Sequence, residues 1–261
     1  MGINYFDVQE LKDIEIARYS SCISDIDWVF GSNLKDSKAH GLPASAITLC
    51  GGEAGVGKTR IWAEICYQMS IEGFKVLYIQ LEMPLFAFKS NFLKNKKLLS
   101  GYFFCSVERD IDDICTIIKK IKPHLVVIDS VNKINDFRSG RNASKIQDKL
   151  RNTINYIGSH VVLLSQLNQD KTVKGGTELP HMGDIVLKII RNVDYGCVEV
   201  VIGKTRYGET GRNALFRHKD DGVECITENW RRSPDSKEIY FKGQGTMTDM
   251  VTRILKAHEN D

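Results

Sequence analysis

The eight residues from 52 to 59 carry the most specific chemistry in this sequence. They read Gly-Glu-Ala-Gly-Val-Gly-Lys-Thr and meet the pattern G-x-x-x-x-G-K-[ST] at every fixed position. Glycines let backbone N–H groups turn inward around phosphates, where a Cβ would block the approach. Lys58 adds a positive charge, which also makes it a catalytic candidate, and Thr59 offers a hydroxyl to Mg²⁺. The residues expected to bind the nucleotide are Gly52, Glu53, Ala54, Gly55, Val56, Gly57, Lys58, Thr59 and Arg60.

The segments on either side of this loop have the character that the motif requires. Residues 46–50 are apolar and β-prone, and residues 60–70 can form a helix. A strand, a glycine-rich loop and a helix N-terminus together make an anion site. The alternative is a chance glycine-rich turn, and the match at all fixed positions argues against it. We therefore expect ATP and Mg²⁺ as cofactors.

A second metal candidate is Asp129, which ends the run Leu-Val-Val-Ile-Asp. A buried strand of this kind delivers its carboxylate to the Mg²⁺ shell of a nucleotide. Alone the pattern is weak, because an aspartate after aliphatic residues is common at strand ends. Its place downstream of the phosphate loop, in an alternating strand and helix pattern, favours a metal role shared with Thr59.

Four more residues lie at predicted strand ends and are catalytic candidates. Glu82 follows the strand expected at 75–81, where a carboxylate could orient the attacking water or be a solvated loop residue. Gln166 could contact the γ-phosphate or cap a loop. Lys204 and Arg206 are two positions apart, so they project to the same side of a strand end. The alternative for this pair is an ordinary solvated basic turn.

Composition and charge narrow the class of protein. The hydrophobic content of 42% and the charged content of 26% are ordinary for a globular chain. The net charge of +3 is too weak to indicate nucleic-acid binding, so any basic surface must be local. No apolar run approaches the length of a membrane span, and the N-terminus does not read as a signal peptide. The seven cysteines form no C-x-x-C pair, which disfavours zinc and fits reduced thiols in a cytoplasmic protein.

Short apolar strands alternate with amphipathic helices from Pro43 onward. Ile111, Ile114, Ile118 and Ile121 have helical spacing, as do Ile146, Leu150, Ile154 and Ile157. This alternation predicts an α/β fold with a mostly parallel central sheet flanked by helices. After Gly183 the strand candidates are joined by turns, so the sheet is expected to finish antiparallel. Further expected elements are strands at 125–128, 161–164, 185–190, 197–202 and 213–217, and helices at 85–97 and 247–257.

With 261 residues the chain can hold one sizeable α/β core and short appendages. We expect three regions. Residues 1–40 form an N-terminal arm and lead-in segment, residues 41–225 form the core, and residues 226–261 form a C-terminal extension.

Residues 43–219 resemble the RecA-fold core shared by DnaB-type replicative helicases and the bacterial RadA (Sms) helicase, a RecA-like P-loop NTPase. Leu-Glu-Met-Pro at 81–84 looks like the helicase motif whose glutamate activates water. Ser-Gln-Leu-Asn at 165–168 looks like the segment that couples the γ-phosphate to a DNA-binding loop. His-Met-Gly-Asp at 181–184 and Lys-Thr-Arg-Tyr-Gly at 204–208 resemble the His-Met-x-Asp and Lys-Asn-Arg-Phe-Gly signatures of RadA. Ile26-Asp-Trp-Val-Phe-Gly31 resembles the segment that precedes the RadA core.

This resemblance implies an ATP hydrolase whose site lies between subunits, with Lys204 and Arg206 supplied by the neighbour. The implied function is an ATP-driven motor on single-stranded DNA, a DNA-dependent ATPase and hexameric DNA helicase of replication or recombination. The chain would assemble as a homo-oligomeric ring and work with replication or recombination partners. One alternative is a strand-exchange or branch-migration ATPase, and another is a loader or regulatory ATPase acting on proteins. Ring against filament and the direction of travel stay open.

In this family the loops after the strands bearing Asp129 and Gln166 face a central channel. Here both loops contain basic residues and glycine, as expected of loops that grip a phosphate backbone. Phe137 is their only aromatic residue, so backbone contacts should outweigh base stacking. The alternative is two solvated surface loops. The residues expected to bind DNA are Lys133, Arg138, Arg141, Lys171, Lys174, Gly175 and Gly176.

The sequence departs from both families outside the core. It has neither the four-cysteine zinc module and protease-like domain of RadA nor the helical collar of DnaB. We therefore expect a bare motor core, a form that suits phage or mobile-element systems.

Overall fold

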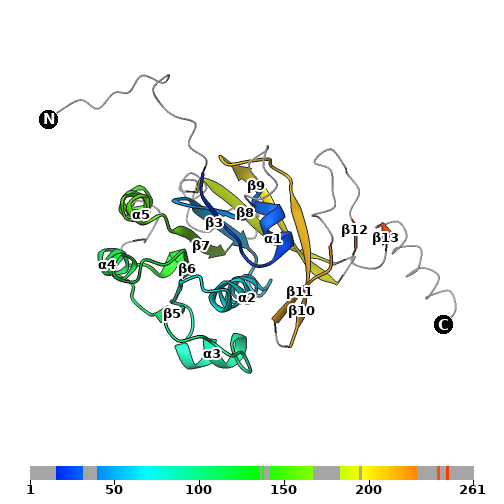
Figure 1. Cartoon of the computed structure of the whole chain (residues 1–261), viewed down its shortest axis with the longest axis horizontal. Helices are drawn as coiled ribbons and strands as arrows, with labels where there is room; N and C mark the ends of the chain where they lie inside the picture. The colour runs from blue at the N-terminus through cyan, green and yellow to red at the C-terminus, as the bar shows by residue number, and fades with distance from the viewer. Residues whose placement is uncertain are drawn as a thin grey trace, which may run out of the picture.

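The computed structural model describes residues 16–31, 40–135, 137, 142–166, 183–193, 196–220, 222–227, 240–241 and 245–246 (Figure 1). Strands alternate with helical segments from β3 to β7, and every described element after β7 is a strand. In chain order they are β1 Arg18–Tyr19, α1 Ser24–Phe30, β2 Leu42–Pro43, β3 Ile47–Gly52, α2 Lys58–Ile71, β4 Val76–Gln80, α3 Leu85–Phe92, β5 Phe103–Ser106, α4 Ile111–Ile121, β6 Leu125–Asp129, the 3-10 helix η2 Val131–Lys133, α5 Ala143–Ile157, β7 His160–Gln166, β8 Ile185–Asn192, β9 Cys197–Thr205, β10 Asn213–Lys219, β11 Gly222–Cys225, β12 Tyr240–Phe241 and β13 Gly245–Thr246.

A nine-stranded sheet in the order β11-β10-β9-β8-β3-β7-β6-β4-β5 forms the centre of the protein. The six strands from β5 to β8 in this order are parallel, and β9, β10 and β11 continue the sheet antiparallel. This arrangement confirms the predicted parallel sheet with an antiparallel C-terminal end. Because the parallel strands all run in the same direction, the carboxyl ends of β3, β4, β6 and β7 lie at the same edge of the sheet.

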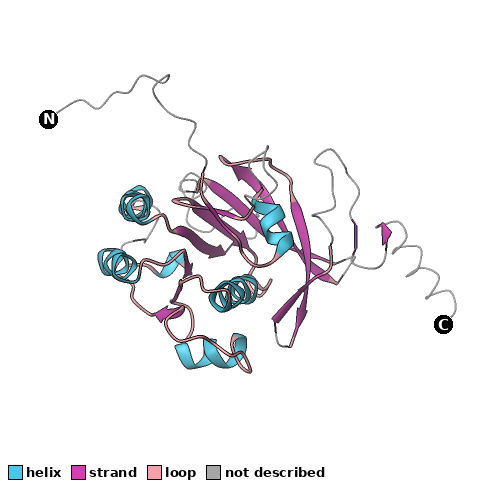
Figure 2. Ribbon diagram, viewed as in Figure 1, coloured by secondary structure: helices cyan, strands magenta, loops and turns pink. Residues whose placement is uncertain are grey.

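Helices cover the sheet on both faces (Figure 2). One core packs α1, α2 and α3 against the sheet, with Phe30, Trp62 and Phe88 among its largest buried side chains. The other core packs α4 and α5 through the isoleucine series that the sequence predicts. The strands between the two cores are buried on both faces, which explains their continuous apolar character.

Local signals explain where α4 and α5 begin and end. The Asp110 carboxylate caps α4 by accepting hydrogen bonds from the backbone N–H groups of Asp112 (2.8 Å) and Asp113 (3.3 Å). Gly158 ends α5 with φ of 88°, a left-handed conformation that glycine adopts without steric cost. These features fix the helix boundaries close to the expected positions.

Several elements differ from the sequence-based expectation, and three of them bear on the packing around the site. The helix expected at 85–97 ends at Phe92, because the chain turns through a left-handed conformation at Asn95 (φ 66°) and brings Lys96 back toward α2. The edge strand β5 and the short helix α1 were not expected. The helix expected at 247–257 lies outside the described residues.

The packed body includes residues that precede the expected start of the core at residue 41. Ile26, Val29 and Phe30 of α1 are buried in the same core as α2. The Arg18 guanidinium donates hydrogen bonds to the backbone oxygens of Phe30 (3.2 Å) and Gly41 (2.9 Å). It also reaches Tyr207 O at 2.7 Å, so the lead-in segment holds the loop between β9 and β10 in place.

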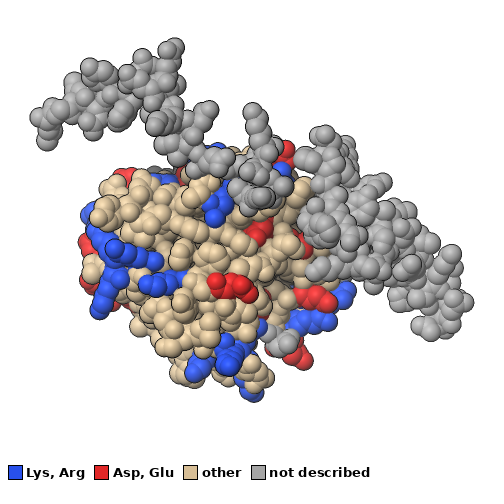
Figure 3. Space-filling view, viewed as in Figure 1, with Lys and Arg blue, Asp and Glu red and all other residues tan. Residues whose placement is uncertain are grey.

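Basic and acidic side chains are interspersed on the face drawn in Figure 3, with basic ones along the edge formed by α4 and α5. This distribution agrees with the weak net charge of the chain. Within the described ranges, no helix combines the length and the apolar character needed to cross a bilayer.

Candidate functional site

The phosphate loop connects the end of β3 to the first residue of α2. Gly55 (φ 72°) and Gly57 (φ 104°) hold the left-handed conformations that turn the loop, which side chains with a Cβ rarely adopt. Lys58 is the first residue of α2, and its ammonium donates hydrogen bonds to Gly52 O and Glu53 O, each at 2.8 Å. The lysine charge is thus folded over the concave side of the loop, at the N-terminus of a helix, where a phosphate would bind.

Two side chains suited to a Mg²⁺ shell meet at this edge of the sheet. The Thr59 hydroxyl donates a hydrogen bond to Asp129 Oδ2 at 2.6 Å, and the Tyr78 hydroxyl donates to the same oxygen at 2.9 Å. Thr59 comes from α2, Asp129 from β6 and Tyr78 from β4. Hydroxyl and carboxylate oxygens are the protein ligands Mg²⁺ accepts beside nucleotide phosphates, so this pair fits the metal expected with a nucleotide.

Burial sets the electrostatics of this cluster. It raises the pKa of Asp129, while the hydrogen bonds from Thr59 and Tyr78 pull that pKa down. It also lowers the pKa of the Lys58 ammonium, against the attraction of nearby acidic groups. Lys58 and Asp129 are therefore both buried charged groups. A bound nucleotide would bring negative charge to the Lys58 ammonium, and its metal would bring positive charge to the Asp129 carboxylate.

Glu82 stands exposed just beyond the end of β4 and lines the same cleft as Lys58. Its backbone is held by Gln80, whose side-chain oxygen accepts hydrogen bonds from the N–H groups of Glu82 (2.8 Å) and Met83 (3.1 Å). Gln80 itself is only 1% exposed. The turn is thus fixed by a buried amide, while the Glu82 carboxylate is left facing the cleft.

The cleft at this edge has a volume of about 600 Å³. Gln166, the last residue of β7, also lines it, so the structure brings together the candidates from four parallel strands. Its lining residues are Ala54, Gly55, Gly57, Lys58, Thr59, Arg60, Glu82, Met83, Phe92, Asp129, Gln166, His218, Lys219 and Asp220.

Lys204 and Arg206 lie at the end of the sheet where the parallel strands begin, away from the phosphate loop. In the strand register, Thr205 of β9 pairs with Ile185 of β8, and Ile185 pairs with Thr48 of β3. The phosphate loop leaves the sheet at Gly52, about 13 Å further on at roughly 3.3 Å per residue. The pair therefore does not belong to the cleft of its own chain.

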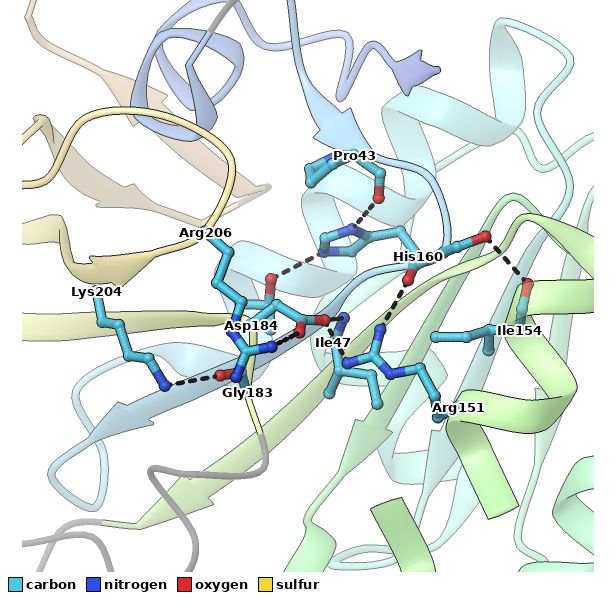
Figure 4. Close-up of polar contacts among 11 residues, drawn as sticks. Pro43, Ile47, Arg151, Ile154, His160, Gly183, Asp184, Lys204 and Arg206 are labelled. Atoms are coloured by element: carbon cyan, nitrogen blue, oxygen red, sulfur yellow. Dashed lines mark hydrogen bonds and ion pairs between the residues drawn. The ribbon is translucent and has the colours of Figure 1, made fainter. Parts of the chain in front are cut away.

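Asp184 is the centre of the contacts around this pair (Figure 4). Its carboxylate accepts hydrogen bonds from the Ile47 N–H (2.9 Å) and the Arg151 guanidinium (2.5 Å), and an Arg206 nitrogen lies 3.7 Å away. Lys204 donates a hydrogen bond to Gly183 O at 3.2 Å. The Arg206 side chain remains 63% exposed, so it is free to leave this loose ion pair.

Of the predicted DNA-binding residues, the structure describes one. Lys133 is exposed at the end of η2, just past Asp129. Phe137, the only aromatic residue of the two predicted DNA loops, is buried at 3% exposure in the core beneath α4 and α5. The Phe137 ring is therefore not exposed for stacking on a base. Arg138, Arg141, Lys171, Lys174, Gly175 and Gly176 lie outside the described residues.

Several residues of the cleft region escaped the sequence analysis, among them Tyr78, Gln80 and His218. Tyr78 and Gln80 sit inside a strand predicted to be buried, where a polar residue was a signal that something must satisfy it. His218 lies on β10, more than 150 residues after the loop it touches, and no local pattern marks it. Only the order of strands brings it to this edge.

These features define a phosphate-loop nucleotide site on a RecA-like fold. The family model described as "ATPase family associated with various cellular activities (AAA)" matches residues 48–175. A solved KaiC-like protein from Pyrococcus horikoshii superimposes with a TM-score of 0.61 over 81% of this chain and 99% of that one, at 19% identity. Such a fold implies the use of a nucleotide and typically of Mg²⁺.

Among curated proteins the chain is similar to RadA. It is 28% identical over 209 residues to "DNA repair protein RadA" of Aquifex aeolicus, covering 75% of this chain and 45% of that protein. It is 26% identical over 238 residues to the RadA of Escherichia coli, covering 84% and 48%. The RadA of Mycolicibacterium smegmatis is 23% identical over 221 residues, covering 80% and 45%. The chain spans about half the length of these relatives.

Proposed function

We propose that this protein is an ATP-driven motor on single-stranded DNA, acting as a homo-oligomeric and most simply hexameric helicase in replication or recombination. Each ATP would sit between two subunits. Lys58, Thr59, Asp129 and Glu82 come from one subunit, and the neighbour contributes Lys204 and Arg206.

The observation that carries this proposal is the separation of the site into two halves. The cleft gathers a phosphate loop, a metal pair, an exposed carboxylate and a terminal amide. The two cations that the Lys-Thr-Arg motif marks as catalytic lie at the other edge of the sheet. Because side chains cannot bridge about 13 Å past a folded sheet, a catalytic role for this pair requires a second copy of the chain.

Each group has a defined task in this account. Bound Mg²⁺ would neutralise charge on the β- and γ-phosphates, and Thr59 and Asp129 would hold it. Lys58 compensates the phosphate charge. Glu82 orients and deprotonates the attacking water, and Gln166 contacts the γ-phosphate or that water. The guanidinium of Arg206 stabilises the charge that develops on the transferred group.

The relatives named as DNA repair proteins favour a second candidate, a branch-migration or strand-exchange ATPase of recombination. It would use the same site and the same single-stranded DNA. A loader or regulatory ATPase acting on proteins is the third candidate. In that case the basic loops would not contact DNA.

Two assays separate these functions. ATP hydrolysis measured with and without single-stranded DNA should rise on adding DNA, and an unchanged rate would favour the loader. Unwinding of a forked duplex should require ATP and should be lost in Glu82→Gln. Stimulation without unwinding would favour the recombination candidate.

The assignment of the DNA loops has its own test. Replacing Lys171 and Lys174 with alanine should weaken single-strand binding and flatten its salt dependence, by roughly 0.7 slope units for each lost phosphate contact. Hydrolysis without DNA should survive. An unchanged salt slope would remove these lysines from the DNA interface.

A further inference from the structure

The antiparallel pair β10–β11 forms a second wall of the nucleotide cleft. The last two residues of β10, His218 and Lys219, line the cleft beside the phosphate loop, together with Asp220. The roles assigned so far to the phosphate loop, the metal pair and the catalytic carboxylate do not use this wall.

His218 contacts the phosphate loop directly. Its Nε2 lies 3.2 Å from Val56 O, and since a carbonyl oxygen only accepts hydrogen bonds, Nε2 is the donor. The ring also fills the space beside Gly57. A Cβ built on Gly57 would lie 2.2 Å from the imidazole Cε1. The ring thus packs on the loop backbone at the residue just before Lys58.

The wall is anchored to the helix that follows the loop. The Arg60 guanidinium donates a hydrogen bond to Lys219 O. Gly222 of β11 packs against Glu64, so closely that a Cβ there would come within 2.4 Å of Glu64 Oε2. Glu64 is held in turn by Lys96 at 2.9 Å. Arg60 and Glu64, both in the first two turns of α2, thus attach this helix to the wall. These contacts fix the position of the His218 ring against the phosphate loop.

We propose that His218 is a positioning residue that braces the phosphate loop in its nucleotide-binding conformation. Its donor ties down the Val56 carbonyl and its ring supports Gly57, so that the loop N–H groups are already directed inward before the nucleotide arrives. Pre-organisation of this kind strengthens binding by lowering its ordering cost. The brace acts on the loop rather than on the γ-phosphate, so ATP and ADP should gain equally.

The test compares two substitutions of similar size, His218→Gln and His218→Leu. Glutamine can place an N–H donor near the position of Nε2, whereas leucine cannot. Affinities for ATP and ADP are measured with fluorescent nucleotide analogues, and the turnover number kcat is measured at saturating ATP. Arg217→Leu is the matched control, because Arg217 is the adjacent exposed residue on the same strand and does not line the cleft.

We expect His218→Leu to weaken ATP and ADP by the same factor, about 3- to 10-fold for the loss of one hydrogen bond and its packing. His218→Gln should recover most of that loss, and kcat should stay within about twofold in both. Unchanged affinities in His218→Leu would overturn the proposal. A loss confined to ATP with a fall in kcat would also overturn it, because it would place His218 on the γ-phosphate. An equal loss in Arg217→Leu would reduce the effect to general destabilisation of β10.

Discussion

At the scale of single residues, Lys58 and Glu82 have separable tasks in the same cleft. Lys58→Ala should weaken both nucleotide binding and turnover, because the phosphate charge loses its compensation. Glu82→Gln keeps the shape of the side chain and loses the base, so the protein should bind ATP and fail to hydrolyse it. Equilibrium binding and phosphate release measure the two effects. Substantial hydrolysis by Glu82→Gln would remove Glu82 from the catalytic role.

Gln80 supports the backbone of Glu82 without lining the cleft itself. Gln80→Leu removes the oxygen that accepts the Glu82 and Met83 N–H groups, so the turn should lose its fixed conformation. We expect kcat to fall by about 10-fold or more, since small misplacements of a catalytic group are costly, with ATP affinity nearly unchanged. Gln80→Glu retains an acceptor oxygen and is the comparison variant. Equal kcat for Gln80→Leu and the unmodified protein would show that the turn holds itself.

His160 makes the fold sensitive to acid. The ring is fully buried, with Nδ1 donating to Pro43 O at 2.8 Å and Nε2 accepting from the Thr48 hydroxyl at 2.9 Å. Burial lowers its pKa to about 4, so the unfolded chain, with an ordinary histidine pKa near 6.5, takes up the proton first. Stability is therefore full above pH 6.5 and is lost as the pH falls toward 4.

Urea unfolding at pH 7.5 and 5.5 measures this effect. The unmodified protein should lose stability between the two values, and His160→Gln should lose less, whatever its overall stability. The half-buried His124, whose pKa burial also lowers, contributes alike to both proteins and cancels. The same pH dependence in both proteins would contradict the assignment.

The residues that carried local signals were predictable, and those that depend on the fold were not. The types and spacing of Gly52 to Thr59 and of Asp129 mark them in the sequence. In the structure Asp129 lines one cleft with Ala54, Gly55, Gly57, Lys58 and Thr59. Gln80 and His218 matter because of what lies opposite them, which requires the strand order. The burial of Phe137 beneath α4 and α5 could not be read from its position in a loop, because it depends on how the chain folds back.

At the scale of elements, the ion pair between Lys96 and Glu64 locks the segment after α3 onto α2. The two side chains are 12% and 8% exposed and 2.9 Å apart, and Gln68 donates a further hydrogen bond to Glu64. Lys96→Met leaves the Glu64 carboxylate buried without its partner. We expect a loss of roughly 3 kcal/mol in the free energy of unfolding, at the lower end for a broken buried pair.

Lys149→Met is the control for this experiment, because it breaks an exposed pair with Asp112 on α4 and α5. It should leave the urea midpoint unchanged. The double variant Glu64→Gln with Lys96→Met should recover much of the loss, since no unpaired charge is then buried. Equal midpoints for Lys96→Met and Lys149→Met would show that the pair does not hold α3.

The elements themselves were largely predictable for a similar reason. The isoleucine series of α4 and α5 have a helical period because each helix buries one face, and the parallel strands are continuously apolar because both faces are covered. The helix predicted at 85–97 was longer than α3, which ends at Phe92. The apolar residues of this segment did not indicate that the chain turns at Asn95 and that Lys96 pairs with Glu64. Long-range pairing of this kind has no local signature.

At the scale of the whole molecule, the proposed function requires a nucleotide site to which two copies of the chain contribute. Lys204 and Arg206 sit beside Gly183 and Asp184, at the sheet edge away from their own phosphate loop. Arg206 is exposed and loosely paired, so it can reach a phosphate presented by a neighbouring copy. Loss of an arginine in this role typically costs roughly 10³–10⁵ in rate, and lysine cannot reproduce its planar fork. Arg206→Ala and Arg206→Lys should therefore both abolish hydrolysis.

The most direct test of this account is ATP hydrolysis by mixed assemblies of Lys58→Ala and Arg206→Ala. Neither variant should hydrolyse ATP alone, because each lacks one half of every site. When the two are mixed and shown to co-assemble, an intact Lys58 faces an intact Arg206 across some interfaces, and DNA-stimulated hydrolysis should return. If co-assembled mixtures remain as inactive as the separate variants, Arg206 does not act on the neighbour's nucleotide and the shared site is contradicted.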